Sequence, residues 1–376
     1  VSSFDSSSLF LPDARLTTGK MAMDTQDAPQ MIEHLRKSIS FTPHDTKWIP
    51  KSARFVTCGV SPRNKGVLLL HELQRGELKT VLECNDLLPC GIKCATFGAS
   101  RVSHRRVAVG AYDGTLNIFD LSVGQTSNEP SKIFSVQGHQ GLINCIDGIG
   151  GASVGHGAPE IATGGKDGVV RIWDPRVDYP VISFEPDEGS ANRDCWTVSF
   201  GDSYNDMDRC LVTGYDNGDV KLFDLRTNTV RWETNCSNGV TCAEFDRKDI
   251  EMNKLIVTTL ESTFRCYDMR TRHAKDDFSH LKEEAHRSTI WLGRHLPQNR
   301  DIFMTGGGNG GFNIYKYHYP LNRVTKHEED GLPIGKMGDI ELLNSRVIST
   351  QPVTSFDWSL DKAGLCCMSC LDQTVR

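Results

Sequence analysis

Histidine, threonine and aspartate occur in the middle of the chain, in a combination that could support nucleophilic catalysis. His139 could act as a base, Thr163 as a hydroxyl nucleophile and Asp167 as the carboxylate that orients the base. However, the spacing of four residues from Thr163 to Asp167 is repeated from Thr305 to Asn309. A repeated spacing favours a structural motif over a catalytic triad.

The cysteines and glycines offer two further candidate sites, and neither has the context that its chemistry requires. Cys367 and Cys370 have the spacing of a zinc or redox pair, but no second Cys or His pair stands near them in sequence. The glycine-rich run 306–311 resembles a phosphate loop in composition, yet no helix is expected after it. We therefore expect no catalytic residues, no metal and no cofactor, and we expect the 13 cysteines to be free thiols.

The composition is that of a globular protein without a nucleic-acid or membrane partner. Hydrophobic residues make up 38% and charged residues 24% of the 376 residues. The net charge of -6 is opposite in sign to the basic surface that phosphate groups require. No apolar run approaches the roughly 18–20 residues of a membrane helix, and no secretory signal is visible. We expect a cytoplasmic protein.

A turn flanked by two apolar runs is repeated along the chain. The strongest copies are Ala111–Asp120, Gly165–Asp174 and Tyr215–Asp224, and weaker copies lie at Leu260–Asp268 and Gly308–Tyr315. In the strong copies Asp-Gly or Asn-Gly stands between the runs, which is a turn signal because glycine readily takes positive φ. Each repeat is therefore predicted to be a small antiparallel sheet that stacks against its neighbours.

Another strand-like run precedes each turn, and seven such runs can be counted. They begin near Pro43, Ile92, Ile143, Cys195, Val240, Ile290 and Val353. The pattern resembles that of WD-repeat proteins, and it predicts an all-β, seven-bladed WD40 β-propeller. We expect the last blade to be truncated and closed by an N-terminal strand within Met31–Phe41, because a strand lent from one terminus removes the free edge of the ring.

Two segments are expected to differ from the propeller, which we place over residues 29–376. Residues 1–28 are rich in Ser, Asp and Thr, and we expect them to form a disordered N-terminal extension. The connection between the sixth and seventh blades is long. We expect a mobile loop at about 322–338, with a strand resuming near Ile340.

One repeat contains the full structural tetrad of the WD-repeat family. By this resemblance, the side chains of His139, Thr163, Asp167 and Trp173 hydrogen-bond in series and clamp the loop ends of one blade. Phe or Tyr replaces the Trp in other repeats. The tetrad explains the catalytic-looking residue types without any reaction.

Alignment of the repeats predicts two rings of residues on the loop-bearing face of the propeller. The first ring, near the start of each innermost strand, is His44, Lys93, Asn144, Trp196, Thr241, Trp291 and Thr354. The second ring, just before each turn, is Tyr112, Lys166, Asp216, Leu260, Gly308 and Leu371.

Large aromatic and apolar side chains in these rings favour a protein-binding surface, because such side chains bury much area at little entropic cost. The candidate interaction rim consists of Tyr112, Lys166, Arg193, Trp196, Asp216, Leu260, Trp291 and Leu371. The alternative is that Trp196 and Trp291 pack between adjacent blades as core residues.

Several segments that propeller geometry does not require resemble one family of WD-repeat proteins, the Monad family. They are Ile146–Gly151, Gly157–Ile161, Arg193–Val198, Tyr215–Arg226, Arg231–Asn235, Phe245–Ile250, Arg294–Arg300 and Ser349–Pro352. The resemblance implies a cytoplasmic scaffold that works with RuvB-like ATPases and with prefoldin-like and TPR co-chaperones. Its clients would be dynein arm subunits, assembled before they enter cilia, and links to apoptosis are also implied. No catalytic residues accompany the resemblance.

The same fold is also compatible with a second function. WD propellers also serve as substrate-recognition subunits of ubiquitin ligases or of chromatin-associated complexes. A ligase receptor would carry Trp-Asp-x-Arg after the third strand of a blade, and Trp173–Arg176 and Phe223–Arg226 come close to that pattern. Identification of the bound partners would distinguish the two functions.

Overall fold

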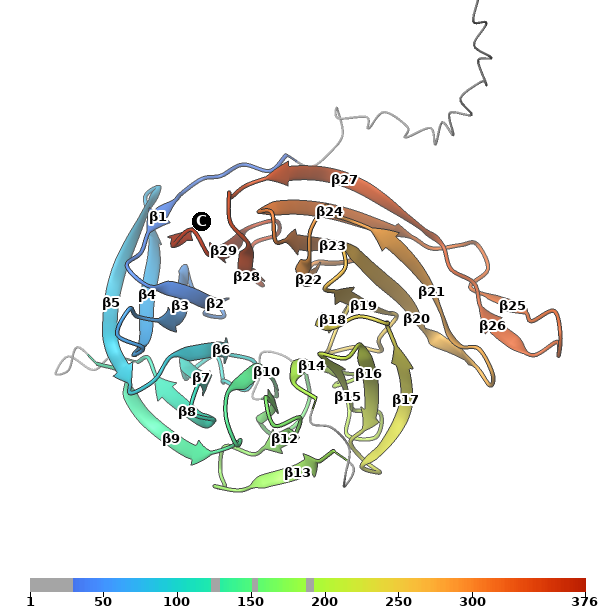
Figure 1. Cartoon of the computed structure of the whole chain (residues 1–376), viewed down its shortest axis with the longest axis horizontal. Helices are drawn as coiled ribbons and strands as arrows, with labels where there is room; N and C mark the ends of the chain where they lie inside the picture. The colour runs from blue at the N-terminus through green and yellow to red at the C-terminus, as the bar shows by residue number, and fades with distance from the viewer. Residues whose placement is uncertain (1–29, 123–128, 151–154, 187–192) are drawn as a thin grey trace, which may run out of the picture.

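The protein forms a ring of seven four-stranded antiparallel sheets, the blades, around a central axis (Figure 1). This computed structural model describes residues 30–122, 129–150, 155–186 and 193–376. In these ranges there is no helix of the length and apolar character that would let it span a membrane. The predicted seven-bladed WD40 propeller is therefore confirmed.

Blades 1 to 4 each take four consecutive strands. Blade 1 contains β2 (Thr42–Trp48), β3 (Arg54–Val60), β4 (Gly66–Gln74) and β5 (Glu77–Leu88). Blade 2 contains β6 (Ile92–Thr96), β7 (Arg106–Ala111), β8 (Thr115–Asp120) and β9 (Ser131–Gln137). Blade 3 contains β10 (Ile143–Ile149), β11 (Glu160–Gly165), β12 (Val170–Trp173) and β13 (Pro180–Phe184). Blade 4 contains β14 (Cys195–Gly201), β15 (Cys210–Tyr215), β16 (Asp219–Asp224) and β17 (Thr229–Asn235).

Blades 5 to 7 complete the ring, and the last two of them do not consist of four consecutive strands. Blade 5 contains β18 (Val240–Phe245), β19 (Lys254–Thr259), β20 (Thr263–His273) and β21 (Asp277–Glu284). Blade 6 contains β22 (Ile290–Leu296), β23 (Asn299–Gly307), β24 (Gly311–His318) and β27 (Asp339–Val347). Blade 7 contains β28 (Val353–Trp358), β29 (Cys366–Cys370), β30 (Thr374–Val375) and β1 (Lys37–Ser38).

The tight turns between the second and third strands follow directly from their residues. In blade 2 the Asp113 carboxylate accepts a hydrogen bond from the main-chain N–H of Thr115 at 3.0 Å, and Gly114 has a φ of 84°. A Cβ atom at Gly114 would lie 2.2 Å from the carbonyl oxygen of His139. Only glycine fits both the conformation and the space.

The core lies between neighbouring blades, where the apolar faces of the inner strands meet. Phe200, Phe245, Phe303 and Phe356 come from the inner two strands of four different blades, and all are fully buried. Because each blade buries its faces only against its neighbours, the ring has to close for the end blades to be covered.

The N-terminal segment closes the ring. Strand β1 pairs antiparallel with β30, with Lys37 opposite Val375, so blade 7 combines strands from both ends of the chain. The main-chain N–H of Ile39 also donates to the carbonyl of Gln373 at 2.9 Å. The predicted closing strand within Met31–Phe41 is thus present. The disordered extension expected for residues 1–28 lies outside the described residues.

The long connection between β24 and β27 contains a hairpin that the sequence analysis did not predict. Strands β25 (Val324–Lys326) and β26 (Pro333–Gly335) pair antiparallel within the segment 322–338, where a loop was expected. The sequence pattern does not reveal this hairpin, because it is short and its two strands show no alternation of buried residues. The strand expected near Ile340 is β27, which begins at Asp339. Mobility of the hairpin stays a prediction.

Candidate protein-interaction surface

The innermost strand of every blade carries a β-bulge near its start. In blade 4, for example, Cys195 pairs with Tyr215 and Thr197 with Gly214, which leaves Trp196 as the extra residue. The extra residues of the seven bulges are His44, Lys93, Asn144, Trp196, Thr241, Trp291 and Thr354. They are the first ring of the sequence alignment. A bulge re-aims its extra side chain away from the ladder, so one residue per blade is presented in the same way.

The second ring lies beside the first at the same end of the blades. In each case the main-chain N–H of a second-ring residue donates to the carbonyl of the residue that precedes the innermost strand of the same blade, at 2.8–3.0 Å. The six donors are Tyr112, Lys166, Asp216, Leu260, Gly308 and Leu371. The acceptors are Gly91, Leu142, Asp194, Gly239, Thr289 and Pro352. The two rings therefore lie side by side at one end of the blades, and we call this surface the rim. It contains every residue of the candidate interaction rim except Arg193, which lies next to the acceptor Asp194 in sequence.

Three large rim side chains face solvent. Trp291 is 42% exposed, Tyr112 38% and Leu371 39%, and they come from blades 6, 2 and 7. Trp196 and Leu260 are half-buried. Neither tryptophan is among the fully buried core residues.

Trp196 reaches from blade 4 across to blade 5. A Cβ atom at Gly239 would lie 2.8 Å from Cζ3 of Trp196 and 3.1 Å from Cδ1 of Leu260. Gly239 thus leaves the space that the indole ring occupies beside Leu260. Trp291 lies near another glycine, because a Cβ atom at Gly308 would be 3.3 Å from its Nε1 atom.

Polar groups on the rim are only partly paired. The Tyr112 hydroxyl and His44 Nε2 are 2.6 Å apart. Burial lowers the pKa of His44 to about 4, so at neutral pH the ring is uncharged and can accept the tyrosine hydroxyl proton. Asp216 Oδ1 and Asn144 Nδ2 are buried and have no hydrogen-bond partner within the described part of the chain. Buried polar groups are usually hydrogen-bonded in native proteins, so these two atoms are exceptions.

The charged residues predicted for the rim flank Trp196. Lys166 and Arg193 are exposed. Burial raises the pKa of the Asp194 carboxyl, and the nearby Asp216 carboxylate raises it further. The rim around Trp196 therefore combines an indole ring, two close carboxyl groups and two cationic side chains.

The four tetrad residues of blade 3 hydrogen-bond in series. His139 Nδ1 lies 2.9 Å from Asp167 Oδ1, and His139 Nε2 lies 2.8 Å from Thr163 Oγ1. The indole N–H of Trp173 donates to the same Thr163 oxygen at 2.8 Å. His139, Thr163 and Trp173 are all buried, and both histidine nitrogens are occupied. This arrangement holds a blade together and exposes no nucleophile.

Blade 6 repeats part of the same pattern. His286 Nε2 lies 2.8 Å from Thr305 Oγ1, and burial lowers the pKa of His286 to about 4. Tyr315 takes the place of Trp173, and its hydroxyl accepts a hydrogen bond from the Asn313 amide at 2.9 Å. The neutral histidine therefore acts as a buried structural group.

The cysteines form no disulfide, and ten of the 13 are buried. Burial raises the pKa of the Cys84 thiol to about 11 and that of Cys366 to about 12. Thiols with such pKa values are weak nucleophiles at neutral pH. The cysteines behave as small apolar residues of the blades.

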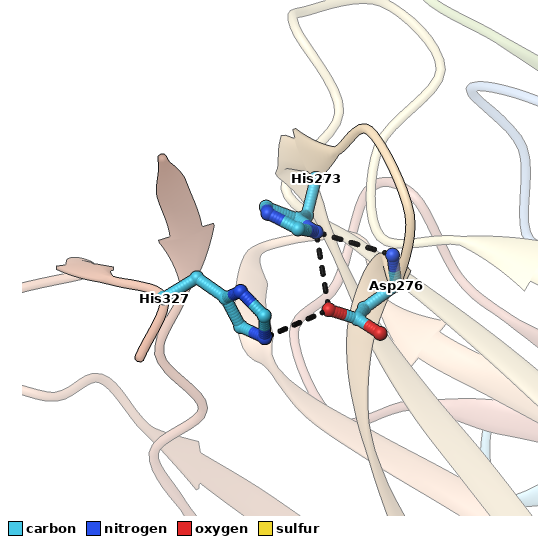
Figure 2. Close-up of side chains that lie close together, drawn as sticks. All are labelled: His273, Asp276 and His327. Carbon is cyan, nitrogen blue, oxygen red and sulfur yellow. Dashed lines mark hydrogen bonds and ion pairs between the residues drawn. The ribbon is translucent and has the colours of Figure 1, made fainter. Parts of the chain in front are cut away.

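Sequence reasoning missed one cluster of side chains, which we call the His–Asp cluster: His273, Asp276, His327 and Asp330. It joins blade 5 to the β25–β26 hairpin, and Figure 2 shows three of its members. The signal was present in the sequence, since His-x-x-Asp occurs at both places. The two copies are far apart along the chain, so their spacing did not suggest a common site.

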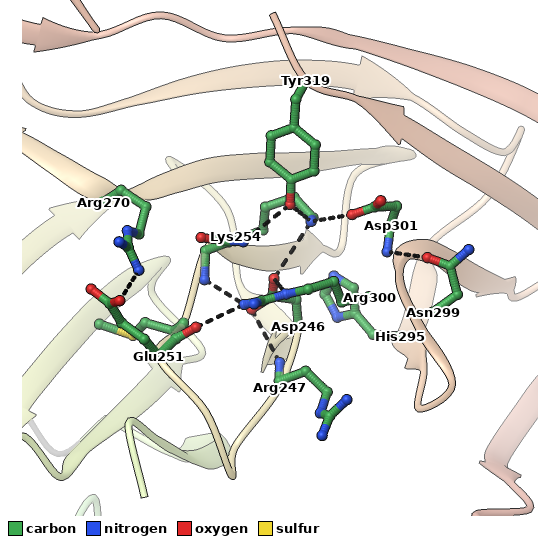
Figure 3. A network of polar contacts seen from close by, with 12 residues as sticks. Asp246, Arg247, Glu251, Lys254, Arg270, His295, Asn299, Arg300, Asp301 and Tyr319 are labelled. Atoms are coloured by element: carbon green, nitrogen blue, oxygen red, sulfur yellow. Dashed lines mark hydrogen bonds and ion pairs between the residues drawn. The ribbon is translucent and has the colours of Figure 1, made fainter. Parts of the chain in front are cut away.

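A second polar network anchors the base of the same hairpin (Figure 3). Lys254 is buried, and its Nζ lies 3.4 Å from Asp246 Oδ2 and 3.3 Å from Asp301 Oδ1. It also contacts the hydroxyl of Tyr319, at the start of the β24–β27 connection. Arg300 Nε lies 2.8 Å from the same Asp246 oxygen. These ion pairs join blades 5 and 6 on the side where the hairpin leaves the ring.

Comparisons with known proteins agree with the fold and with the family resemblance. A family model described as "WD domain, G-beta repeat" matches residues 130–174, the repeat that contains the tetrad. The chain is 52% identical over 351 residues to "Dynein axonemal assembly factor 10" of Xenopus laevis, covering 93% of this chain and 96% of that protein.

Relatives from distant organisms match over the same extent. The chain is 50% identical to the Homo sapiens protein of that name over 355 residues, and 50% identical to the Chlamydomonas reinhardtii protein over 356 residues. Each match covers 94% of this chain and 97% of the relative. The resemblance inferred from sequence is confirmed, and the chain belongs to the dynein axonemal assembly factor 10 family of WD-repeat proteins.

Proposed function

We propose that the chain is a non-enzymatic scaffold that docks partner proteins on its rim during cytoplasmic preassembly of axonemal dynein arms. The observation that carries the proposal is the identity of at least 50% to dynein axonemal assembly factors from a frog, a human and an alga, over more than nine tenths of the chain. The family resemblance adds the candidate partners: RuvB-like ATPases, prefoldin-like and TPR co-chaperones, and dynein arm subunits as clients.

The rim has the physical properties of a docking surface. Trp and Tyr are enriched among the few residues that supply most of the binding energy at protein interfaces, because they bury a large area with few rotatable bonds. Trp291 and Tyr112 are exposed on the rim, and Trp196 is half-buried on a different blade.

The geometry of the tetrad supports a function without catalysis. His139 has neither nitrogen free, because Asp167 and Thr163 occupy both. Thr163 Oγ1 is completely buried and also accepts from Trp173. A substrate would have to displace the core of blade 3 to reach these groups.

The test is partner recovery from ciliated cells with the tagged full-length chain and its Trp196→Ala and Trp291→Ala variants. We expect each variant to lose recovery of RuvB-like ATPases or co-chaperones, while its melting temperature stays near that of the wild type. The matched control is Trp48→Ala in β2, since Trp48 is buried and that variant should lose stability. Unchanged recovery in both rim variants would contradict the use of the rim.

The same experiment decides the second candidate function. The sequence Trp173–Arg176 approaches the ligase-receptor pattern, and the Arg176 side chain is 72% exposed while it pairs with Asp174. Recovery of cullin-adaptor subunits without RuvB-like ATPases would replace the scaffold proposal with that of a substrate-recognition subunit.

A further inference from the structure

The His–Asp cluster is built from two segments that share the pattern His-x-x-Asp and lie on different parts of the fold. His273 ends β20, and Asp276 follows in the turn to β21 of blade 5. His327 and Asp330 lie in the turn of the β25–β26 hairpin, which is inserted in blade 6. The two imidazole rings are 4.5 Å apart between centroids, so the hairpin tip is seated directly on blade 5.

Each carboxylate of the cluster contacts both imidazoles. Asp276 Oδ2 lies 3.1 Å from His273 Nδ1 and 3.1 Å from His327 Nε2 (Figure 2). Asp330 lies on the other side of the rings, 3.2 Å from His273 Nε2 and 3.1 Å from His327 Nδ1. All four imidazole nitrogens therefore face a carboxylate oxygen.

Four contacts between imidazole nitrogens and carboxylate oxygens need four N–H donors, which is more than two neutral histidines provide. A neutral imidazole carries one N–H, and an ionised carboxylate only accepts. The main-chain N–H groups of Lys275 and Asp276 donate to His273 Nδ1 at 3.3 and 3.1 Å, which identifies that nitrogen as an acceptor. The proton of His273 is then on Nε2 and points to Asp330.

Three potential ligand atoms converge on the side of the cluster that faces Asp276: His273 Nδ1, Asp276 Oδ2 and, when its proton points to Asp330, His327 Nε2. A cation bound there would take the lone pair of His273 Nδ1 in place of the main-chain N–H groups of Lys275 and Asp276. The three ligand atoms lie within 4.8 Å of one another. A divalent cation between them would neutralise the two carboxylates and replace the missing donors.

We propose that His273, Asp276 and His327 bind one divalent transition-metal ion, in the first place Zn²⁺. Two imidazole nitrogens and one carboxylate oxygen form a donor set that suits this ion. Asp330 would accept hydrogen bonds from the far nitrogens of both histidines, which is the usual way in which metal-bound imidazoles are oriented. The Asp276 side chain is 51% exposed, so the ion can enter from solvent.

The consequence of metal binding would be a fixed hairpin. Other contacts already join the hairpin and its base to blade 5: for example, the Ser279 hydroxyl donates to the Gly335 carbonyl at 2.7 Å, and Arg323 pairs with Asp268 at 3.1 Å. The metal would add an attachment at the tip. The proposal is independent of the rim and of its partners, because it concerns a different segment.

The experiment uses the full-length chain without a histidine tag, treated with EDTA and then dialysed. Titration with zinc chloride in a calorimeter should show one equivalent bound, and zinc should raise the melting temperature, because a ligand of the folded state stabilises it. Magnesium chloride should do neither. Absence of stoichiometric zinc binding would overturn the proposal.

Variants of the more accessible ligands test the assignment. We expect His327→Gln and Asp276→Asn to abolish zinc binding while their melting temperatures in EDTA stay near that of the wild type. Asp330→Asn should weaken binding by about 10–100-fold, as for other groups that orient metal ligands. The control is His318→Ala, since His318 pairs with Glu341 at 2.7 Å on the surface of blade 6 without a second histidine.

Cobalt provides a check that the ion is not held by cysteine. Co²⁺ bound at the cluster should give weak visible absorption and no sulfur charge-transfer band. A strong charge-transfer band, or full zinc binding by the His327→Gln variant, would place the ion elsewhere and overturn the proposal.

Discussion

The Asp357 carboxylate accepts a hydrogen bond from the main-chain N–H of Trp48 at 2.7 Å, and so joins the last blade to the first across 309 residues of sequence. Similar bonds join other neighbours, since Asp147 accepts from the N–H of Phe200 and Glu244 from that of His295. Side chains of the innermost strands thus hold each blade to the next.

Asp357 should make stability depend on pH. Burial raises its pKa to about 6, with the Lys47 ammonium opposing the shift. The folded state therefore binds the proton more tightly than the unfolded state, so the contribution of Asp357 to stability is present below about pH 4 and is lost as pH rises through about 6.

The Asp357→Asn variant isolates this contribution. We expect the wild type to gain stability relative to the variant as pH falls from 7 to 4, measured as the difference in denaturant midpoint at each pH. A difference that is constant over this range would show that the carboxyl titrates normally.

Loss of the tetrad should destabilise blade 3. His139→Ala leaves Thr163 and Asp167 without their partner in a buried site, which should cost about 2–4 kcal/mol. Gln140→Ala is the control, because Gln140 contributes its main-chain N–H to Asp167 and its side chain is exposed. Denaturant unfolding monitored by circular dichroism measures the stability of both variants. Equal stability of the two variants would contradict a clamping role.

The network around Asp246 predicts which of two substitutions in it costs more stability. Asp246→Ala removes the shared partner of Lys254 and Arg300 and should cost about 3–5 kcal/mol, because Arg300 loses its carboxylate partner and the buried Lys254 keeps only Asp301. Lys254→Met should cost less, since Asp246 keeps Arg300 at 2.8 Å and two main-chain N–H donors, those of Arg247 and Asn253. Unfolding midpoints of the two variants test the order, and the reverse order would be inconsistent with a shared acceptor.

Removal of the closing strand should expose an edge of blade 7. A variant that lacks residues 1–41 loses β1 and the buried Ile39 and Phe41, so we expect a lower melting temperature and aggregation. A variant that lacks residues 1–28 should melt as the full chain does. Light scattering during thermal unfolding compares the two, and similar behaviour of both variants would rule out a closing role for β1.

The local parts of the fold could be predicted from sequence. The innermost strands of blades 2 to 7 begin at the predicted residues, Ile92, Ile143, Cys195, Val240, Ile290 and Val353, and β2 begins at Thr42 beside the predicted Pro43. Period-two alternation and Asx-Gly turns are properties of adjacent residues, so a single sequence contains them.

Features that depend on pairing between strands could not be predicted. The bulge at Trp196 is defined by its register against β15, and sequence alignment located the residue without showing why it protrudes. Likewise, the contact between His273 and His327 requires the β25–β26 hairpin to fold back on blade 5. Both the bulge register and the contact between the histidines depend on residues that are far apart in the sequence.

The shared seventh blade has a consequence for how the protein is made. Strand β1 is synthesised before blade 1, but its partner β30 emerges from the ribosome only after blades 1 to 6 have been translated. Until then the growing ring has two uncovered blade faces and an unpaired strand. A protein of this design therefore exposes apolar blade faces on its nascent chain until β30 has been translated.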